Sequence, residues 1–377
     1  MKISKIETFI LHVPVTGNHI ADAMHSITHW GVPGCVIHTD EGLAGYGFAG
    51  THGHLPTDKL ITDCIAGTYA PLLVGEVLET REDIARLWKR LYHFPPAQWV
   101  GRSGITHLGL AAVDVALWDL LAKAAGQPLW ALLGEPDPAP LVAYNTDGGW
   151  LNLSLDQVVD NCRRFVEQDG FGGVKIKVGK PDLSEDLDRV AAVRAAIGAE
   201  VMLMVDANGK WDLDRALRAD PVLHELGVFF VEEPLWYDDI AAHRTLASDG
   251  NTKVALGEQL YSYYDFKNFI DARALHMAQP DVTRLAGISE WLRVADLAAT
   301  SGLPVIAHAG DMGQVHVHTS LAHHGCSMLE YIPWIRDCYV EPMTVRDGTF
   351  VRPNRPGAGT QFRDDASRFL VHGALDI

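Results

Sequence analysis

Three short runs decide the fold of this chain: Val201-Met-Leu-Met-Val-Asp206, Val228-Phe-Phe-Val-Glu232 and Val254-Ala-Leu-Gly-Glu258. Each is apolar and ends in an acid, and the acids are spaced 26 residues apart, at positions 206, 232 and 258. Apolar runs of this length are typical of strands buried on both faces, and the interval leaves room for one crossover helix. The spacing therefore predicts a (β/α) barrel.

Similar runs continue the pattern on both sides. They are Leu141-Val-Ala-Tyr-Asn145, Gly173-Val-Lys175-Ile-Lys177, Leu275-His-Met-Ala-Gln-Pro-Asp281, Leu303-Pro-Val-Ile-Ala-His308 and Cys326-Ser-Met-Leu-Glu330. From the second strand onward each run ends in an ionisable side chain. Because the carboxyl ends of parallel barrel strands meet at one mouth, we expect these side chains to gather there.

The acids Asp206, Glu232 and Glu258 are the predicted metal ligands. Any one of them could instead cap the helix that follows it. Three in register on adjacent strands favour a divalent cation, which prefers carboxylate oxygens. Mg2+ fits an oxygen-only set, whereas zinc is usually bound by His or Cys.

Several of these motifs together resemble the enolase superfamily, and within it the mandelate racemase subgroup. They are Lys-Ile-Lys177, Val-Asp206-Ala-Asn208, Val-Glu232-Glu233-Pro234, Leu-Gly-Glu258, Gln-Pro-Asp281, His308, Leu-Glu330 and the helix-like segment 111–119. The resemblance implies an α/β fold, a (β/α)7β-type modified TIM barrel with an N-terminal α+β capping domain that the C-terminal tail completes. It also implies a homo-oligomer.

The length of the chain agrees with two domains. At 377 residues it is long for a bare barrel of about 250 residues, and the surplus is mostly N-terminal. There, residues 2–12 alternate like a strand, 34–50 read as a hairpin, and 82–91 have one apolar helical face. We predict a capping domain over 1–134, a barrel over 135–330 and a returning tail over 331–377. The Gly45-Tyr-Gly47-Phe-Ala-Gly50 match to a dinucleotide fingerprint is rejected because it lies inside the hairpin.

Chemistry suggests a role for each strand-end group. Removing the proton next to a carboxylate creates an enediolate, whose charge a divalent metal stabilises. Lys177 is the predicted base, with a pKa lowered by Lys175 or by the metal. Asp281 beside His308 should orient the ring and favour its protonated form, which makes an acid/base pair. Lys177 and His308 come from nearly opposite strands and should address opposite faces of one carbon.

The resemblance supplies the remaining roles. Glu330 is expected to donate a hydrogen bond to the enolate oxygen, Asn208 to contact a substrate hydroxyl, and Lys175 to face the substrate carboxylate. Lid loops at about 16–30 and 48–55 should close over the mouth, with His25 and His52 as candidate substrate contacts.

The lid is rich in histidine, which suits a polyhydroxylated acid. We therefore expect a lyase, an acid-sugar dehydratase that converts an aldonate or aldarate to a 2-keto-3-deoxy acid. A racemase, epimerase or cycloisomerase using the same Lys/His pair is the alternative, and a barrel that only binds an acid is a third.

Composition limits the other possibilities. A net charge of −17 disfavours nucleic acid as a partner. The five cysteines are scattered and odd in number, which predicts a reducing, cytoplasmic setting. We find no signal-peptide pattern in the first residues, and Asp114 and Asp119 interrupt the most apolar helix, so no membrane is expected.

Overall fold

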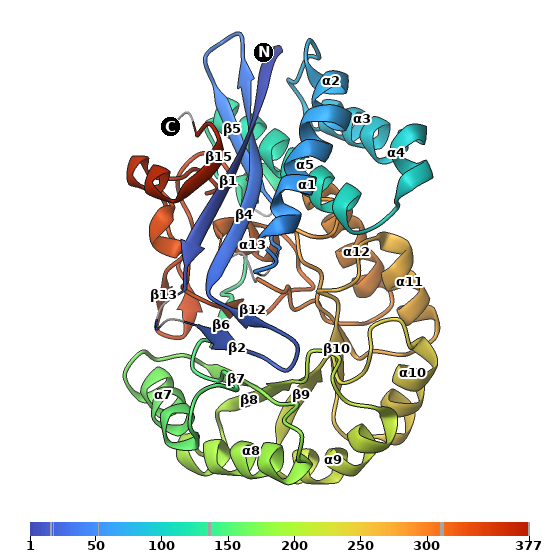
Figure 1. The fold of residues 1–377 in the computed structure, drawn as a ribbon, viewed down its shortest axis with the longest axis vertical. Helices are drawn as coiled ribbons and strands as arrows, with labels where there is room; N and C mark the ends of the chain where they lie inside the picture. The colour runs from blue at the N-terminus through green and yellow to red at the C-terminus, as the bar shows by residue number, and fades with distance from the viewer. Residues whose placement is uncertain (16, 18, 52, 135–136, 310–312, 376–377) are drawn as a thin grey trace.

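The computed structural model describes residues 1–377 except 16, 18, 52, 135–136, 310–312 and 376–377. A mixed cap lies above a barrel in the view of Figure 1, and the β2–β3 hairpin, in blue, reaches over the barrel mouth. The predicted architecture is confirmed.

The barrel is a parallel sheet. Its strands are β6 (Val142–Asn145), β7 (Gly173–Lys177), β8 (Met202–Asp206), β9 (Val228–Glu232), β10 (Val254–Leu256), β11 (Met277–Ala278) and β12 (Met328–Tyr331), with β12 paired to β6. The strand predicted at 303–308 is reduced to Val305, which bridges Ala278 on one side and Cys326 on the other. Pro304 precedes it and lacks the N–H that a longer ladder would need.

Inward-facing side chains fill the barrel: Tyr144, Met204, Phe230, Ala255, Met277, Ile306 and Met328 form one buried cluster. Outside lie α7 (Leu155–Glu167), α8 (Leu183–Ile197), α9 (Leu213–Glu225), α10 (Ile240–Asp249), α11 (Tyr263–Asp271), α12 (Ile288–Thr300) and α13 (Gln314–Leu321). Several of these helices begin where a side chain caps them, as Ser154 does for α7 and Ser262 for α11. Within the described residues these seven helices alternate with the strands, as the (β/α)7β prediction requires.

The cap is an antiparallel sheet with helices on one side. The strand order is β15 (Leu370–Gly373), β1 (Ile3–Pro14), β4 (His29–Thr39) and β5 (Ala44–Phe48), so the tail returns to the cap as expected. The helical side holds α1 (Pro56–Cys64), a π-helix (Ile65–Tyr69), α2 (Ala70–Leu73), α3 (Arg81–Tyr92), α4 (Pro95–Val100), α5 (Ile105–Ala124) and α6 (Leu129–Leu133). Short pieces complete the fold: β2 (Ile20–Ala21), β3 (Ser26–Ile27), β13 (Val345–Arg346), β14 (Thr349–Phe350) and 3-10 turns at Arg336–Cys338 and Asp364–Phe369.

Two glycines explain why the apparent dinucleotide motif occurs. Gly45 and Gly47 lie in β5, against helix α5. A Cβ at Gly47 would lie 1.9 Å from the carbonyl oxygen of Ala112, so only glycine lets the strand and the helix approach this closely. The glycines lie inside the hairpin, as expected, and serve packing within the cap.

Helix α5 joins the cap to the barrel. Among the residues that the structure describes, it alone is long and apolar enough to cross a membrane, but 89% of its apolar window is buried inside the protein. Asp114 accepts hydrogen bonds from the backbone N–H and the hydroxyl of Ser289 at the start of α12. Asp119 accepts from the N–H groups of Tyr46 and Ala358. These buried acids thus link α5 to the cap sheet, the barrel and the tail.

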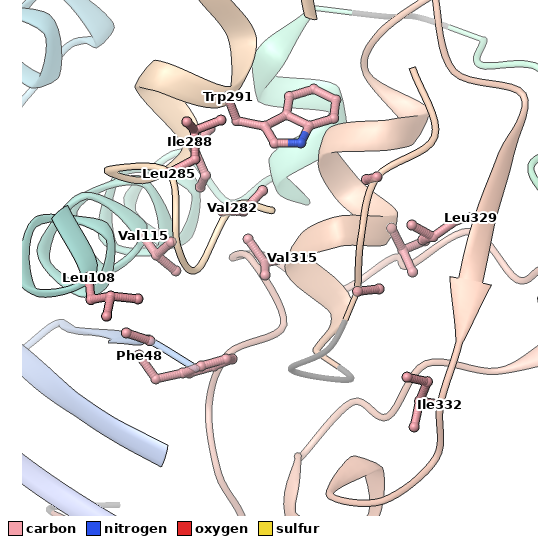
Figure 2. Close-up of a cluster of buried hydrophobic side chains, with 14 of the residues drawn as sticks. Phe48, Leu108, Val115, Val282, Leu285, Ile288, Trp291, Val315, Leu329 and Ile332 are labelled. Atoms are coloured by element: carbon pink, nitrogen blue, oxygen red, sulfur yellow. The ribbon is translucent and has the colours of Figure 1, made fainter. Parts of the chain in front are cut away.

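Cap and barrel share one hydrophobic core. Figure 2 shows side chains of the cap, such as Phe48 and Val115, near barrel side chains such as Val282 and Trp291. Because burial of apolar surface supplies most of the stability of a fold, this continuity holds the cap in a fixed position over the barrel mouth.

Candidate active site

The strand ends meet beneath the lid in a cavity of about 190 Å3. Its lining is Asp22, His25, Ile27, Trp30, Thr51, Trp150, Lys177, Asn208, Glu258, Gln259, Arg284, His308, Glu330, Ile332 and Trp334. The volume is below the roughly 300–1,000 Å3 of sites for drug-sized ligands, which suits a compact acid. Six predicted site residues are therefore at the cavity. Lys175, Asp206, Glu232 and Asp281 lie behind its surface, and His52 lies outside the described residues.

The lysines of β7 are paired with acids of the neighbouring strands. Lys177 is in register with Asp206, and Asp206 with Glu232. The Nζ of Lys177 lies 2.5 Å from Asp206 Oδ2. The Nζ of Lys175 donates to both Glu232 oxygens at 2.7 Å and lies 2.8 Å from Glu330 Oε1.

These pairs bear on two expectations. Burial has the largest effect on the pKa of Lys177 and, with the charge of Lys175, lowers it, but Asp206, Asp22 and Glu258 together raise it above its ordinary value. Lys175 by itself therefore does not give the lowered pKa, and lowering by a bound metal stays a prediction. Lys175 is only 1% exposed and does not line the cavity. It lies between Glu232 and Glu330 beneath the cavity, and its contact with a substrate carboxylate stays a prediction.

His308 lies between two carboxylates. Its Nδ1 is 2.7 Å from Asp281 Oδ2, and its Nε2 is 2.7 Å from Glu258 Oε2. Burial lowers the pKa of His308, but Glu258 and Asp281 outweigh this and raise it well above its usual value. The structure thus brings Asp281 and His308 together, and the two carboxylates favour the protonated ring. The second carboxylate, Glu258, was not expected in this contact.

Glu330 is an acceptor in this arrangement. It accepts from the hydroxyl of Thr146 at 2.6 Å and lies beside Lys175. Burial raises its pKa, but Lys175 and His308 together lower it to about 2. A hydrogen bond donated by Glu330 to an enolate would need a proton that these neighbours disfavour.

The donor set fits a hard divalent cation. Among the described residues no group of three His, Cys, Asp or Glu side chains is already arranged around a cation position, since Asp206, Glu232 and Glu258 face Lys177, Lys175 and His308. Buried strand-end carboxylates nevertheless outnumber the cations: Asp206, Glu232, Glu233, Glu258, Asp281 and Glu330 against Lys175, Lys177, Arg284 and His308.

The excess negative charge has a visible consequence. Burial, together with Glu258, Asp206 and Glu232, raises the pKa of Glu233 well above its usual value. The oxygens Asn208 Oδ1, Glu233 Oε2 and Gln279 Oε1 are buried without a hydrogen-bond partner. A divalent cation held by the predicted oxygen ligands would offset this charge.

Some site residues escaped the sequence analysis. His316 is fully buried, with its Nε2 3.0 Å from Asp281 Oδ1. Arg284 comes three residues after Asp281 and donates to Gln259 and Tyr261, so its proximity to a strand end was a usable signal. Trp30 lies at the end of the predicted lid loop 16–30, whereas Trp150 and Trp334 come from loops where no spacing pointed to them.

The comparisons with known proteins place the chain in a family. Residues 5–134 match the model of the mandelate racemase/muconate lactonizing enzyme N-terminal domain, and residues 157–366 match the enolase C-terminal domain-like model. The protein belongs to the enolase superfamily, in its mandelate racemase/muconate lactonizing subgroup.

Its relatives include acid-sugar enzymes. The chain is 36% identical over 338 residues to the L-talarate/galactarate dehydratase of Salmonella typhimurium, covering 88% of this chain and 81% of that one. It is 32% identical over 371 residues to the 3,6-anhydro-alpha-L-galactonate cycloisomerase of Streptomyces coelicolor, covering 95% and 96%. The Salmonella crystal structure with Mg and L-lyxarohydroxamate superposes with a TM-score of 0.91 at 32% identity, over 99% of this chain and 94% of that one.

Proposed function

We propose that this protein removes the proton α to the carboxylate of an acid sugar and eliminates the 3-hydroxyl, giving a 2-keto-3-deoxy acid. The observation that carries the proposal is one cavity lined by the amine of Lys177 and by the imidazole of His308, which Asp281 holds at 2.7 Å. The names of the relatives, among them an arabinonate dehydratase of Saccharolobus solfataricus at 31% identity, support the substrate class.

The two groups have separate tasks. Lys177, in its neutral form, takes the proton from C2 as the C2–H bond breaks. His308 cannot take that proton while it carries its own, so it acts as the acid and protonates the 3-hydroxyl as the C3–O bond breaks and water leaves. The remaining enol becomes the keto acid. Asp281 keeps the His308 ring oriented and charged, and Asn208 and His25 are positioned to contact hydroxyls.

Asp206, Glu232 and Glu258 would hold Mg2+, which supplies positive charge to the substrate carboxylate and offsets the Asp206 charge that keeps Lys177 protonated. Crystal structures of relatives that contain Mg, among them those from Salmonella typhimurium and Streptomyces coelicolor, support this choice of metal.

A cycloisomerase or racemase is the second candidate, favoured by the Streptomyces coelicolor relative. It would use the same proton abstraction without releasing water. The proposed domain boundaries at 134 and 330, a homo-oligomeric state and a cytoplasmic setting stay predictions. The five free cysteines agree with a reducing compartment.

The test is turnover of an acid-sugar library with Mg2+, followed by semicarbazide detection of a keto acid. We expect one or a few aldonates or aldarates to react, and Lys177→Ala to remove the activity while retaining Mg2+ binding. Incorporation of solvent deuterium at C2 without a keto acid would instead indicate a racemase. No reaction of any acid, with Mg2+ bound, would refute the proposal.

A further inference from the structure

A second pair of an acid and an imidazole lines the cavity, and it comes from the lid. The turn of the β2–β3 hairpin carries Asp22 and His25, and both residues line the cavity. The Nδ1 of His25 lies 3.0 Å from Asp22 Oδ2 and 3.1 Å from Asp22 Oδ1. Because Nδ1 faces the acid, Nε2 is the nitrogen that can reach a ligand. Asp281 and His308 repeat this arrangement on the barrel, where an acid also faces Nδ1.

The hairpin fixes the position of the lid pair. Asp22 Oδ1 accepts from two backbone N–H groups of the turn, both at 2.7 Å. A Cβ at Gly179 would lie 2.6 Å from the Cβ of Ala23, so the glycine lets the hairpin rest on the loop that follows β7. Gly179 comes two residues after Lys177. Burial raises the pKa of Asp22, but its bond with His25 and the charge of Lys177 lower it below its ordinary value.

The lid imidazole differs from the buried groups in its access to water. The side chain of His25 is 44% exposed, whereas those of His308 and Lys177 are 6% and 7% exposed. The hydrogen bond to Asp22 raises the pKa of His25 above its ordinary value, although burial lowers it. His25 therefore meets both the cavity and bulk water, and it can exchange a proton with solvent while the hairpin covers the mouth.

The proposed elimination leaves one proton transfer without a donor. The enol that forms when water leaves has a double bond between C2 and C3. It becomes a keto acid only when C3 gains a proton and the C2 hydroxyl loses one. His308 has already given its proton to the departing hydroxyl, so it can accept the C2 hydroxyl proton but has none for C3. Lys177 holds the proton from C2, and Asp206, at 2.5 Å, stabilises that charge.

We propose that His25, supported by Asp22, is the acid that protonates C3 of the enol. This inference rests on the proposed elimination. The proton on Nε2 of His25 passes to C3 as the C2–C3 double bond becomes single, and His308 takes the proton of the C2 hydroxyl as the carbonyl forms. His308 thereby regains its acid form. Lys177 then releases the proton from C2 to water and His25 takes one from water, so the cycle consumes no net proton.

The test is the position of solvent deuterium in the product. The protein with Mg2+ converts an acid sugar in D2O, and proton NMR at early times assigns the two C3 hydrogens of the keto acid. We expect the wild type to place one deuterium at C3 in a single configuration. His25→Gln should still remove the C2 hydrogen at an almost unchanged rate. It should release the enol, which takes deuterium from water on either face, so the product becomes an equal mixture of the two C3 configurations.

Two further variants separate proton donation from support of the lid. Asp22→Asn keeps an oxygen for the backbone N–H groups of the turn and removes the charge beside the ring, so its product should be a mixture that still favours the wild-type configuration. His29→Gln is the matched control and should keep the single configuration. His29 is an exposed histidine of the same lid and is not among the described residues that line the cavity.

Four results would overturn the inference. They are an equal mixture from the wild type, a single configuration that persists in His25→Gln, a C3 hydrogen that comes from C2 of the substrate, and loss of C2–H cleavage in His25→Gln. The third would assign the donor role to Lys177, and the fourth would make His25 a support of the site. If no acid sugar reacts with the wild type, the proposed function fails and this inference falls with it. A keto acid with any of the four results refutes the inference alone.

Discussion

Two acids in this protein, the buried Asp281 and the half-buried Asp147, each hold a pair of ring nitrogens, and they differ in what those rings can do. Asp281 lies 2.7 Å from Nδ1 of His308 and 3.0 Å from Nε2 of His316. Asp147 lies 2.6 Å from the indole nitrogen of Trp334 and 3.5 Å from that of Trp150. Asp281 supports His308, and Asp147 supports Trp150 and Trp334. These three ring side chains line the same cavity.

The charge state of each acid follows from its partners. Burial raises the pKa of Asp281, but the two imidazoles dominate and lower it well below its usual value. Burial raises the pKa of Asp147, and the neutral indoles lower it too little to compensate. The same arrangement thus gives an acid/base site when the rings can titrate, and a purely structural support when they cannot.

The largest effect on activity should come from substituting Asp281, because its partner His308 can titrate. Asp281→Asn removes the charge that keeps His308 protonated, so we expect kcat to fall by about 10²- to 10³-fold. Since the pKa of His308 is raised in the folded protein, activity that needs its acid form is lost as pH rises through that pKa. In Asp281→Asn this loss should occur at lower pH, which a pH profile of kcat/KM would measure. An unchanged profile would contradict the role of Asp281.

The next largest effect should be on Mg2+ binding, where substitutions of Glu232 and of Asp147 should differ. Glu232→Gln should weaken Mg2+ binding, and removal of Mg2+ by a chelator should abolish turnover until Mg2+ is restored. Asp147→Asn should bind Mg2+ like the wild type, because Asp147 is not among the proposed ligands. Calorimetry with Mg2+ alone measures both variants. Full Mg2+ affinity in Glu232→Gln would argue against the ligand assignment.

A smaller effect is expected when Trp150 and Trp334 lose their contact with Asp147. Asp147→Leu frees the indoles of Trp150 and Trp334, so kcat/KM should fall by about tenfold to a hundredfold, because small displacements of positioning groups cost this much. Asp147→Asn retains an oxygen that can accept from both indoles and should restore most of the activity. Equal losses in Asp147→Leu and Asp147→Asn would mean that the negative charge of Asp147 matters, and not its ability to accept hydrogen bonds.

The smallest effect concerns stability. Because the pKa of Asp147 is raised on folding, its contribution to the free energy of unfolding is complete below its unfolded pKa and declines as pH rises through the folded value. Asp147→Asn lacks this decline. Urea unfolding at several pH values should therefore show the variant gaining stability relative to the wild type as pH rises. A constant difference would contradict the raised pKa.

Periodicity explains how much the sequence could predict. Lys177, Asp206, Glu232, Glu258, Asp281, His308 and Glu330 were found because parallel strands repeat at regular intervals and their ends converge. The weak strand at 303–308 was overestimated, since Pro304 limits the ladder to Val305.

The remaining errors concern positions and charges that spacing does not encode. Trp150 and Trp334 follow strands at positions that no period marks, and Trp30 begins a cap strand distant in sequence. The histidine-rich lid suggested a polar cavity, but only His25 of the described lid histidines lines it. The pKa of Lys177 depended on whether Asp206 or Lys175 had the larger effect, and residue types alone do not decide that.

The pairing of β15 with β1 bears on how a substrate enters. The chain passes from the cap into the barrel and returns at its end, where β15 pairs with β1. The cap sheet is therefore connected to the barrel at two points. A cap sheet connected in this way, and sharing the core of the barrel, resists movement as one body. We therefore expect substrate and product to pass where the small β2–β3 hairpin covers the mouth, and its Ala21 exchanges hydrogen bonds with the loop at Leu151 and Asn152.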